Sequence, residues 1–98
     1  KTINLPKYGI WSMTKNKEPD LFIKELKNVF QRIVTMPIEN ENGSESAEKL
    51  NKIDINNKIK SETAYNFKDA LKKISSKEKK LVVVFGSLYA AGSILNQN

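Results

Sequence analysis

The stretch LVVVFGSLYAAGSILN, residues 81–96, is the main apolar run of a chain that is otherwise rich in lysine, asparagine and glutamate. Residues 81–85 are continuously apolar and rich in valine, a pattern typical of a strand that is covered on both faces. Residues 88–95 then follow helical spacing. The expected buried side of that helix consists of Leu88, Ala91, Ile94 and Leu95. The stretch therefore predicts a strand, a turn at Gly86-Ser87 and a packed helix.

The first part of the chain shows the same alternation of strand and helix. Residues 8–13 mix aromatic and β-branched side chains, which indicates a buried strand. Asn16 is a candidate N-cap, and Pro19 suits the first turn of a following helix. Apolar residues then recur as in an amphipathic helix of about three turns: Leu21, Phe22, Leu26, Val29 and Phe30. Residues 32–38 predict a second strand that ends at Pro37, because proline cannot donate to a ladder.

The middle of the chain continues the pattern after a polar loop at residues 39–46. We expect a short helix over residues 46–53, a brief strand around residues 58–61 and a second amphipathic helix over residues 64–75. The apolar face of that last helix consists of Phe67, Ala70, Leu71 and Ile74. Strands alternating with helices predict an α/β fold, a doubly wound, mostly parallel sheet with flanking helices.

Length and composition limit the chain to one domain and exclude several classes of site. Its 98 residues, of which 39% are hydrophobic, are enough for one modest core. No apolar run is long enough to span a membrane and no signal peptide pattern is present, so we expect a cytoplasmic protein. The chain has no cysteine and no histidine. Disulfides and thiolate metal sites are thereby excluded, and the usual general base is missing.

The net charge of +6 allows two interpretations, an attraction to phosphates or a solvated lysine-rich surface. Arg32 is the only arginine, and lysine lacks the bidentate fork that reads bases. The aromatic residues are not interleaved with the basic ones, as a stacking platform for bases would require. The composition therefore favours a solvated surface over nucleic-acid binding. The densest basic patch consists of Lys72, Lys73, Lys77, Lys79 and Lys80.

The Gly86-Ser87 turn allows a structural and a ligand-binding interpretation. In doubly wound folds, ligands bind beyond the carboxyl ends of the strands, where helices begin. Gly86 permits a tight turn or a close approach, and Ser87 can cap the next helix or bind an anion. The chain contains neither a GxGxxG fingerprint nor a Walker GxxxxGK[ST] motif. Lys17 follows the first expected strand, where it is either solvated or within reach of a phosphate or carboxylate.

Two segments resemble a known enzyme family. Residues 84–95, VFGSLYAAGSIL, closely resemble the C-terminal signature of folylpolyglutamate synthase and dihydrofolate synthase, a strand followed by TGSLYLVGEVL. Residues 12–18, SMTKNKE, lie where that family usually has GMLxDKD. Met13 and Lys17 match this second motif, whereas Ser12 and Asn16 depart from it. With the intervening order of elements, the resemblance covers almost the whole chain.

The resemblance implies that residues 1–98 are the Rossmann-like C-terminal domain of a Mur ligase-type enzyme without its N-terminal ATPase domain. In this family, ATP activates a folate or pteroate carboxylate as an acyl phosphate, and the amine of L-glutamate attacks it to form an amide. The resemblance assigns ATP and Mg²⁺ to the full enzyme, with folate or dihydropteroate and L-glutamate as its substrates. It implies that this chain alone binds no cofactor, contains no catalytic residue or metal ligand, and is inactive.

By the same resemblance, Ser87 and Tyr89 hold the incoming glutamate, and Gly86 allows its close approach. Lys17 is placed on the nucleotide or phosphate side of the same cleft. The alternative that residue chemistry leaves open is a non-catalytic small α/β module that binds an anionic ligand or nucleic acid through its lysines. A folded remnant of a degraded gene is a third interpretation.

Overall fold

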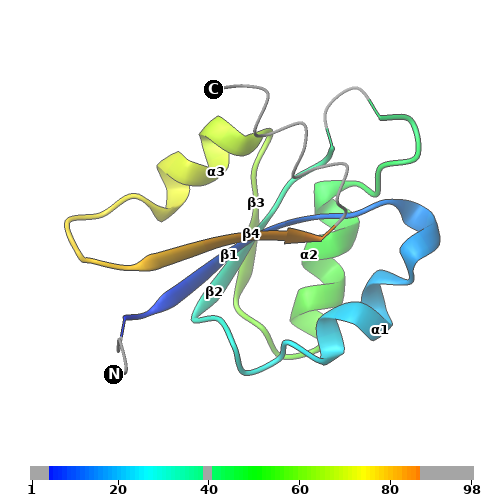
Figure 1. The fold of residues 1–98 in the computed structure, drawn as a ribbon. Coiled ribbons are helices and arrows are strands. Elements are labelled where there is room, and N and C mark those ends of the chain that lie inside the picture. Colours follow the sequence, from blue (N-terminus) through cyan, green and yellow to red (C-terminus); the bar gives the residue numbers. More distant parts are fainter. Residues whose placement is uncertain (1–4, 39–40, 87–98) are drawn as a thin grey trace.

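A parallel sheet organises the chain. The computed structural model describes residues 5–38 and 41–86. Its strands, in chain order, are β1 (Lys7–Ser12), β2 (Arg32–Thr35), β3 (Ser61–Thr63) and β4 (Leu81–Gly86). They form one 4-stranded sheet in the order β3-β2-β1-β4, and all neighbouring strands are parallel (Figure 1). The described helices are η1 (Lys15–Lys17), α1 (Pro19–Lys24), α2 (Ala47–Asn56) and α3 (Phe67–Ile74).

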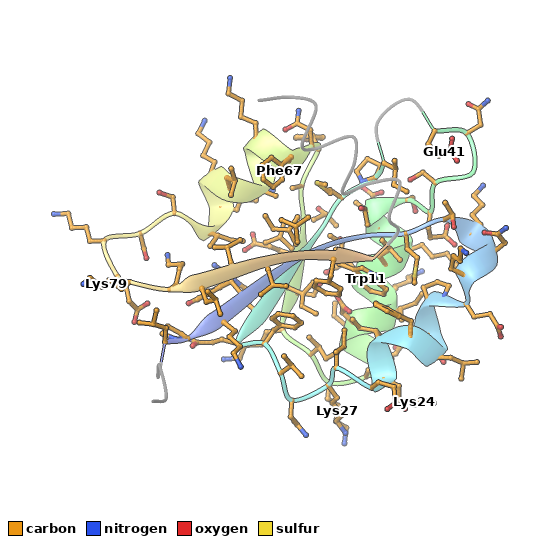
Figure 2. All side chains as sticks on the ribbon, viewed as in Figure 1. Trp11, Lys24, Lys27, Glu41, Phe67 and Lys79 are labelled. Atoms are coloured by element: carbon orange, nitrogen blue, oxygen red, sulfur yellow. The ribbon has the colours of Figure 1, made fainter. Side chains whose placement is uncertain are left out.

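Apolar side chains cover both faces of the sheet because successive residues of a strand point to opposite faces. Ile10 packs in a cluster beneath α3, whereas its neighbour Trp11 packs in a cluster with α1 and α2. Figure 2 shows Phe67 of α3 and Trp11 on opposite sides of the ribbon of β4. Helices on both faces of a parallel sheet confirm the predicted doubly wound class.

An aromatic stack joins β1 and β4 to the segment between α1 and β2. The Phe85 ring lies 5.0 Å from the Phe30 ring and 6.2 Å from the Trp11 ring, centroid to centroid, and is nearly parallel to both. Gly9 provides the space for this stack, since a Cβ atom added there would lie 2.6 Å from Cε1 of Phe85. The absence of a side chain at this position of β1 is therefore a packing requirement.

Helix α1 is shorter than the hydrophobic periodicity predicts. It ends at Lys24, and the chain continues in tight turns in which Leu26 N–H bonds to the Ile23 carbonyl and Val29 N–H to the Leu26 carbonyl. These turns repeat about every three residues, so Leu26 and Phe30 still reach the core without an α-helix, whereas Val29 is 42% exposed. The N-cap is Glu18 in a left-handed conformation, with φ of 49°, and the prediction of Asn16 at this position is wrong.

Helix α2 and strand β3 both lie further along the chain than predicted. The Ser46 hydroxyl caps α2 by accepting a hydrogen bond from Lys49 N–H at 3.1 Å, and the helix continues to Asn56. Lys58 then turns the chain in a left-handed conformation. The strand consequently begins at Ser61, where the sequence pattern had placed its end.

The start of α3 and the surroundings of β4 also differ from prediction. Asn66 caps α3 through its bond from Asp69 N–H, so the helix begins at Phe67 rather than at residue 64. Strand β4 is present, but it lies at an edge of the described sheet. Leu81 and Val82 are 46% and 36% exposed, so the prediction of cover on both faces is wrong for them. The predicted helix over residues 88–95 lies outside the described residues.

Asp54 is a fully buried carboxyl group near the end of α2. Its Oδ2 accepts a hydrogen bond from the Ser61 hydroxyl at 2.7 Å, while its Oδ1 has no hydrogen-bond partner within residues 5–38 and 41–86. Burial raises the pKa of Asp54 from 3.8 to about 7, although the bond from Ser61 opposes the shift. The carboxyl therefore resists ionisation over a range in which the unfolded chain has already lost its proton.

This raised pKa predicts a pH-dependent contribution to stability. Between about pH 4 and pH 7 the unfolded chain is ionised at Asp54 and the folded chain is not, so stability falls as pH rises, by on the order of 4 kcal/mol. Asp54→Asn removes the titration. We expect the free energy of unfolding of this variant, relative to the natural chain, to increase across that range in urea titrations. If the difference in free energy of unfolding between Asp54→Asn and the natural chain is the same at pH 4.5 and pH 8, the raised pKa of Asp54 is contradicted.

Candidate functional site

The carboxyl ends of the strands meet at one edge of the sheet, which we call the carboxyl edge. It is formed by Ser12, Thr35, Thr63 and Gly86, the last residues of β1 to β4. Helices α2 and α3 both begin just beyond this edge (Figure 1). In open α/β sheets this edge is where ligands bind. Topology thus makes it the candidate site.

Two loops are joined at the carboxyl edge, in an arrangement that we call the clasp. Lys15 N–H donates to the Gly43 carbonyl and Glu45 N–H donates to the Met13 carbonyl, both at 2.8 Å. An antiparallel bridge between Thr14 and Ser44 lies between these bonds. The loop after β1 is therefore fixed to the loop before α2, although no local pattern in either segment indicates the contact.

Strand β2 anchors the start of α2 from the same edge. The buried Thr35 hydroxyl donates to the Ala47 carbonyl at 2.7 Å, and Ile38 N–H donates to the Ser44 hydroxyl at 2.8 Å. The Thr35 carbonyl also accepts a bond from Ala64 N–H at 2.7 Å. These contacts hold the connections that follow β2 and β3 in a fixed geometry.

The starts of α2 and α3 at this edge are capped by the protein's own side chains. Ser46 caps α2, as described above. At α3, Asn66 accepts from Asp69 N–H at 2.8 Å, and the Asp69 carboxylate accepts from Tyr65 N–H at 3.0 Å. This exchange resembles a capping box. It leaves the ring of Tyr65, which is 85% exposed, at the carboxyl end of β3.

Gly86 adopts a conformation that side chains rarely allow. Its φ is 118°, and a Cβ atom there would overlap the Ser12 carbonyl oxygen and lie 2.9 Å from the Ser12 carbonyl carbon. Within the described residues, Gly86 thus lies close to the end of β1, whereas its approach to a ligand stays a prediction. Ser87 and Tyr89 lie outside the described residues.

Lys17 ends η1 and its side chain is exposed. It follows β1, the neighbour of β4, so Lys17 and Gly86 come from adjacent strands at the same edge. The Thr14 hydroxyl donates a hydrogen bond to Oδ1 of Asn16 at 2.9 Å. Ser12, which departs from the resembled motif, is fully buried, and its hydroxyl has no hydrogen-bond partner among the described residues.

Sequence reasoning missed Tyr65 and the buried hydroxyl of Ser12. The sequence does contain a signal for Tyr65. This residue directly precedes the Asn-x-x-Asp pattern of a helix start and lies outside the apolar periodicity of that helix, so no pattern predicts its burial. Ser12 carries no comparable signal, since its burial depends on elements distant in the chain.

Lys79 and Lys80 of the basic patch lie at the opposite edge of the sheet, since they directly precede β4, whereas the Lys73 side chain reaches β3. Lys73 Nζ donates to the Thr63 carbonyl at 2.6 Å, and Lys80 Nζ bonds to the Ile74 carbonyl and the Ser76 hydroxyl. Figure 2 shows Lys79 on the loop between α3 and β4, far from Glu41. Part of the patch therefore supports α3 rather than presenting free charge to a polyanion.

Residues 5–38 and 41–86 contain no group of three or more acidic, histidine or cysteine side chains that could hold a metal ion. Within the same residues, no helix is both long and apolar enough to cross a membrane.

Comparison with solved structures identifies folds similar to this one. Folylpolyglutamate synthase from Mycobacterium tuberculosis, complexed with ADP and AMPPCP, matches 94% of this chain at a TM-score of 0.80 and 19% identity. E. coli FolC in complex with ADP, without folate substrate, matches 99% of it at a TM-score of 0.80 and 17% identity. In both cases this chain spans 23% of the matched chain. No protein-family model and no curated protein sequence matches.

The conformation of Gly86 predicts a specific requirement for glycine. Gly86→Ala should lower the free energy of unfolding by about 2 kcal/mol or more, because the methyl group meets backbone and φ is positive. Gly43→Ala is the matched control. A Cβ atom at Gly43 would meet Glu41 Oε2 at 3.8 Å, an ordinary contact distance, so this substitution should change the free energy of unfolding by less than about 0.5 kcal/mol. Equal effects of both substitutions in urea unfolding would contradict this role of Gly86.

Proposed function

We propose that this chain is the C-terminal domain of a cytoplasmic, ATP-dependent folylpolyglutamate or dihydrofolate synthase. The observation that carries the proposal is the agreement of two independent comparisons. The fold matches 94% or more of the chain to folylpolyglutamate synthase structures, and residues 84–95 resemble the C-terminal signature of the same enzymes. The matched proteins are about four times longer, as expected if this chain supplies one domain of several.

The role proposed for this domain is to bind glutamate and to close over the nucleotide. In the proposed reaction, the terminal phosphate of ATP is transferred to a folate or pteroate carboxylate, and ADP leaves. The amine of L-glutamate then attacks the acyl phosphate, so that an amide forms and inorganic phosphate is released. A cationic side chain stabilises the transferred phosphate, and hydroxyl groups orient the carboxylates of glutamate.

The carboxyl edge supplies groups suited to both tasks. Lys17, exposed on the loop after β1, is proposed to contact a phosphate or a substrate carboxylate across the cleft. Ser87 and Tyr89 follow directly after Gly86 and are proposed to donate hydrogen bonds to glutamate. The position of Gly86 at the carboxyl edge, close to the end of β1, supports this proposal.

The remaining parts of the active site are assigned to the N-terminal ATPase domain. This chain has no Walker motif, and the described residues contain no cluster of metal ligands. Mg²⁺, when bound in the full enzyme, would neutralise the ATP phosphates. We therefore propose that the chain alone neither hydrolyses ATP nor ligates glutamate.

A first prediction concerns the chain alone and Lys17. Purified residues 1–98 should form no folate–glutamate amide with ATP, Mg²⁺ and both substrates.

A chimera in which this chain replaces the matching portion of E. coli FolC should restore ligation. In the chimera, Lys17→Met should lower kcat/KM for ATP or for folate about tenfold, since a charge-assisted contact is lost. Lys27→Met, an exposed lysine beyond α1, is the control; equal effects of both changes would remove Lys17 from the site.

A second prediction concerns the glutamate contacts. In the same chimera, Ser87→Ala and Tyr89→Phe each remove one hydroxyl group. Each should raise the KM for L-glutamate about tenfold or more, because a hydrogen bond to a charged group is lost, while the KM for ATP changes little. Steady-state kinetics with glutamate as the varied substrate measures the effect. An unchanged glutamate dependence in both variants would contradict the assignment.

A further inference from the structure

The loop before α2 contains the one Asn-Gly pair of the chain, Asn42-Gly43. Both residues are exposed and form the centre of a turn that Ser44 N–H closes on the Glu41 carbonyl at 3.2 Å. This length is at the long end of the range for N–H···O bonds, so the turn is held loosely. Within residues 5–38 and 41–86, no hydrogen bond involves the Asn42 side-chain amide or Gly43 N–H. These two groups can therefore meet without breaking a bond of their own.

An exposed Asn-Gly pair can cyclise, because glycine has no side chain that blocks the approach of its nitrogen. The Gly43 amide nitrogen loses its proton to hydroxide and attacks Cγ of Asn42. A bond forms between this nitrogen and Cγ, the Cγ–Nδ2 bond breaks, and the leaving nitrogen takes up a proton and departs as ammonia. Water then opens the succinimide ring. Opening at Cγ yields aspartate, whereas opening at the main-chain carbonyl carbon yields isoaspartate, in which the chain runs through Cβ and Cγ.

The other asparagines of the described residues lack this combination of features. Each is followed by a residue that carries a side chain: Asn16, Asn28, Asn51, Asn56, Asn57 and Asn66. Asn51 and Asn56 also lie in α2, where helical hydrogen bonds hold the backbone. Asn28 is exposed, but the β-branched Val29 that follows it hinders ring closure. Asn28 is thus a suitable slow reference for Asn42.

Gly43 is also part of the clasp. Its carbonyl accepts from Lys15 N–H at 2.8 Å, and the next residue, Ser44, forms the bridge to Thr14. Isoaspartate inserts one extra main-chain atom directly before Gly43. Since main-chain bond lengths are fixed, the path from Glu41 to Gly43 becomes longer and the Gly43 carbonyl is displaced from Lys15. Aspartate at the same position leaves the path unchanged.

We propose that Asn42 is a modification site, at which spontaneous deamidation through a succinimide with Gly43 produces isoaspartate and opens the clasp. The loop after β1, which carries Lys17, then loses its attachment to the loop before α2. The new carboxylate also adds a negative charge at the carboxyl edge, which weakens the attraction of anions. The reaction consumes only water, so the proposal does not rest on the ligase assignment.

Peptide mapping by mass spectrometry tests the formation of the modified residue. The 98-residue chain is incubated at pH 6 and pH 8, and a short tryptic digestion releases residues 33–49, which contain Asn42 and also Asn40, an internal control followed by Glu41. At pH 8, Asn42 should deamidate at least about tenfold faster than Asn40 or Asn28. Its rate should be about tenfold or more lower at pH 6, because the attacking nitrogen must lose a proton.

Gly43→Ala is the matched variant for the chemistry, because its effect on folding is expected to be small. Its methyl group should slow deamidation at Asn42 about tenfold or more. The same rate in this variant as in the natural chain would contradict ring closure by the Gly43 nitrogen.

Amide hydrogen exchange measured by NMR tests the effect on the clasp. The isoaspartate form is separated by ion-exchange chromatography. In this form the Lys15 and Glu45 amides, which donate the clasp bonds, should exchange at least about tenfold faster than in the fresh chain. Met36 N–H, which bonds to the Trp11 carbonyl in the sheet, should exchange as before. Asn42→Asp has the same charge on a normal main chain and should keep slow exchange at Lys15 and Glu45.

Three further results would overturn the proposal. One is deamidation of Asn42 no faster than that of Asn40 and Asn28. Another is a rate in the folded chain more than about tenfold below that in the urea-unfolded chain, which would mean that the fold blocks ring closure. The third is unchanged exchange at Lys15 and Glu45 in the isoaspartate form, or equally fast exchange in Asn42→Asp, which would assign the opening to charge. None of these measurements involves ATP or folate.

Discussion

Gly9, in the middle of β1, is the position on which the sheet and its core both depend. Strand β1 pairs with β2 on one side and β4 on the other, so it determines the register of both neighbours. At Gly9 the missing side chain admits the Phe85 ring, which stacks on Phe30 and Trp11. One hydrogen atom in place of a methyl group thus allows the strand pairing and the aromatic packing to be satisfied together.

The fold class follows from the sequence because alternating strands and amphipathic helices are local patterns. The exact ends of the elements do not follow, for a physical reason that α1 illustrates. Turns with bonds between residues three apart place Leu26 and Phe30 in the core almost as a helix would, so periodicity alone cannot distinguish the two. Similarly, the apolar sequence of β4 indicates burial without indicating which element provides the cover.

The site is predictable to the extent that it depends on topology. Lys17 and Gly86 were placed at the carboxyl edge because both follow predicted strands, and the structure puts them there. The contact between the Asp54 carboxyl and the Ser61 hydroxyl, like the clasp, joins segments that have no complementary pattern in sequence. Such contacts arise from the distances that the assembled fold imposes and can be found only in three dimensions.

The clasp has a mechanical consequence for any movement of this domain. Through it, the loop that carries Lys17 is joined to the loop that leads to Ser46, and β2 holds the same region through Thr35. A displacement of either loop alone would break backbone hydrogen bonds, whereas a displacement of both together breaks none of them. The two loops would therefore move together as one rigid unit.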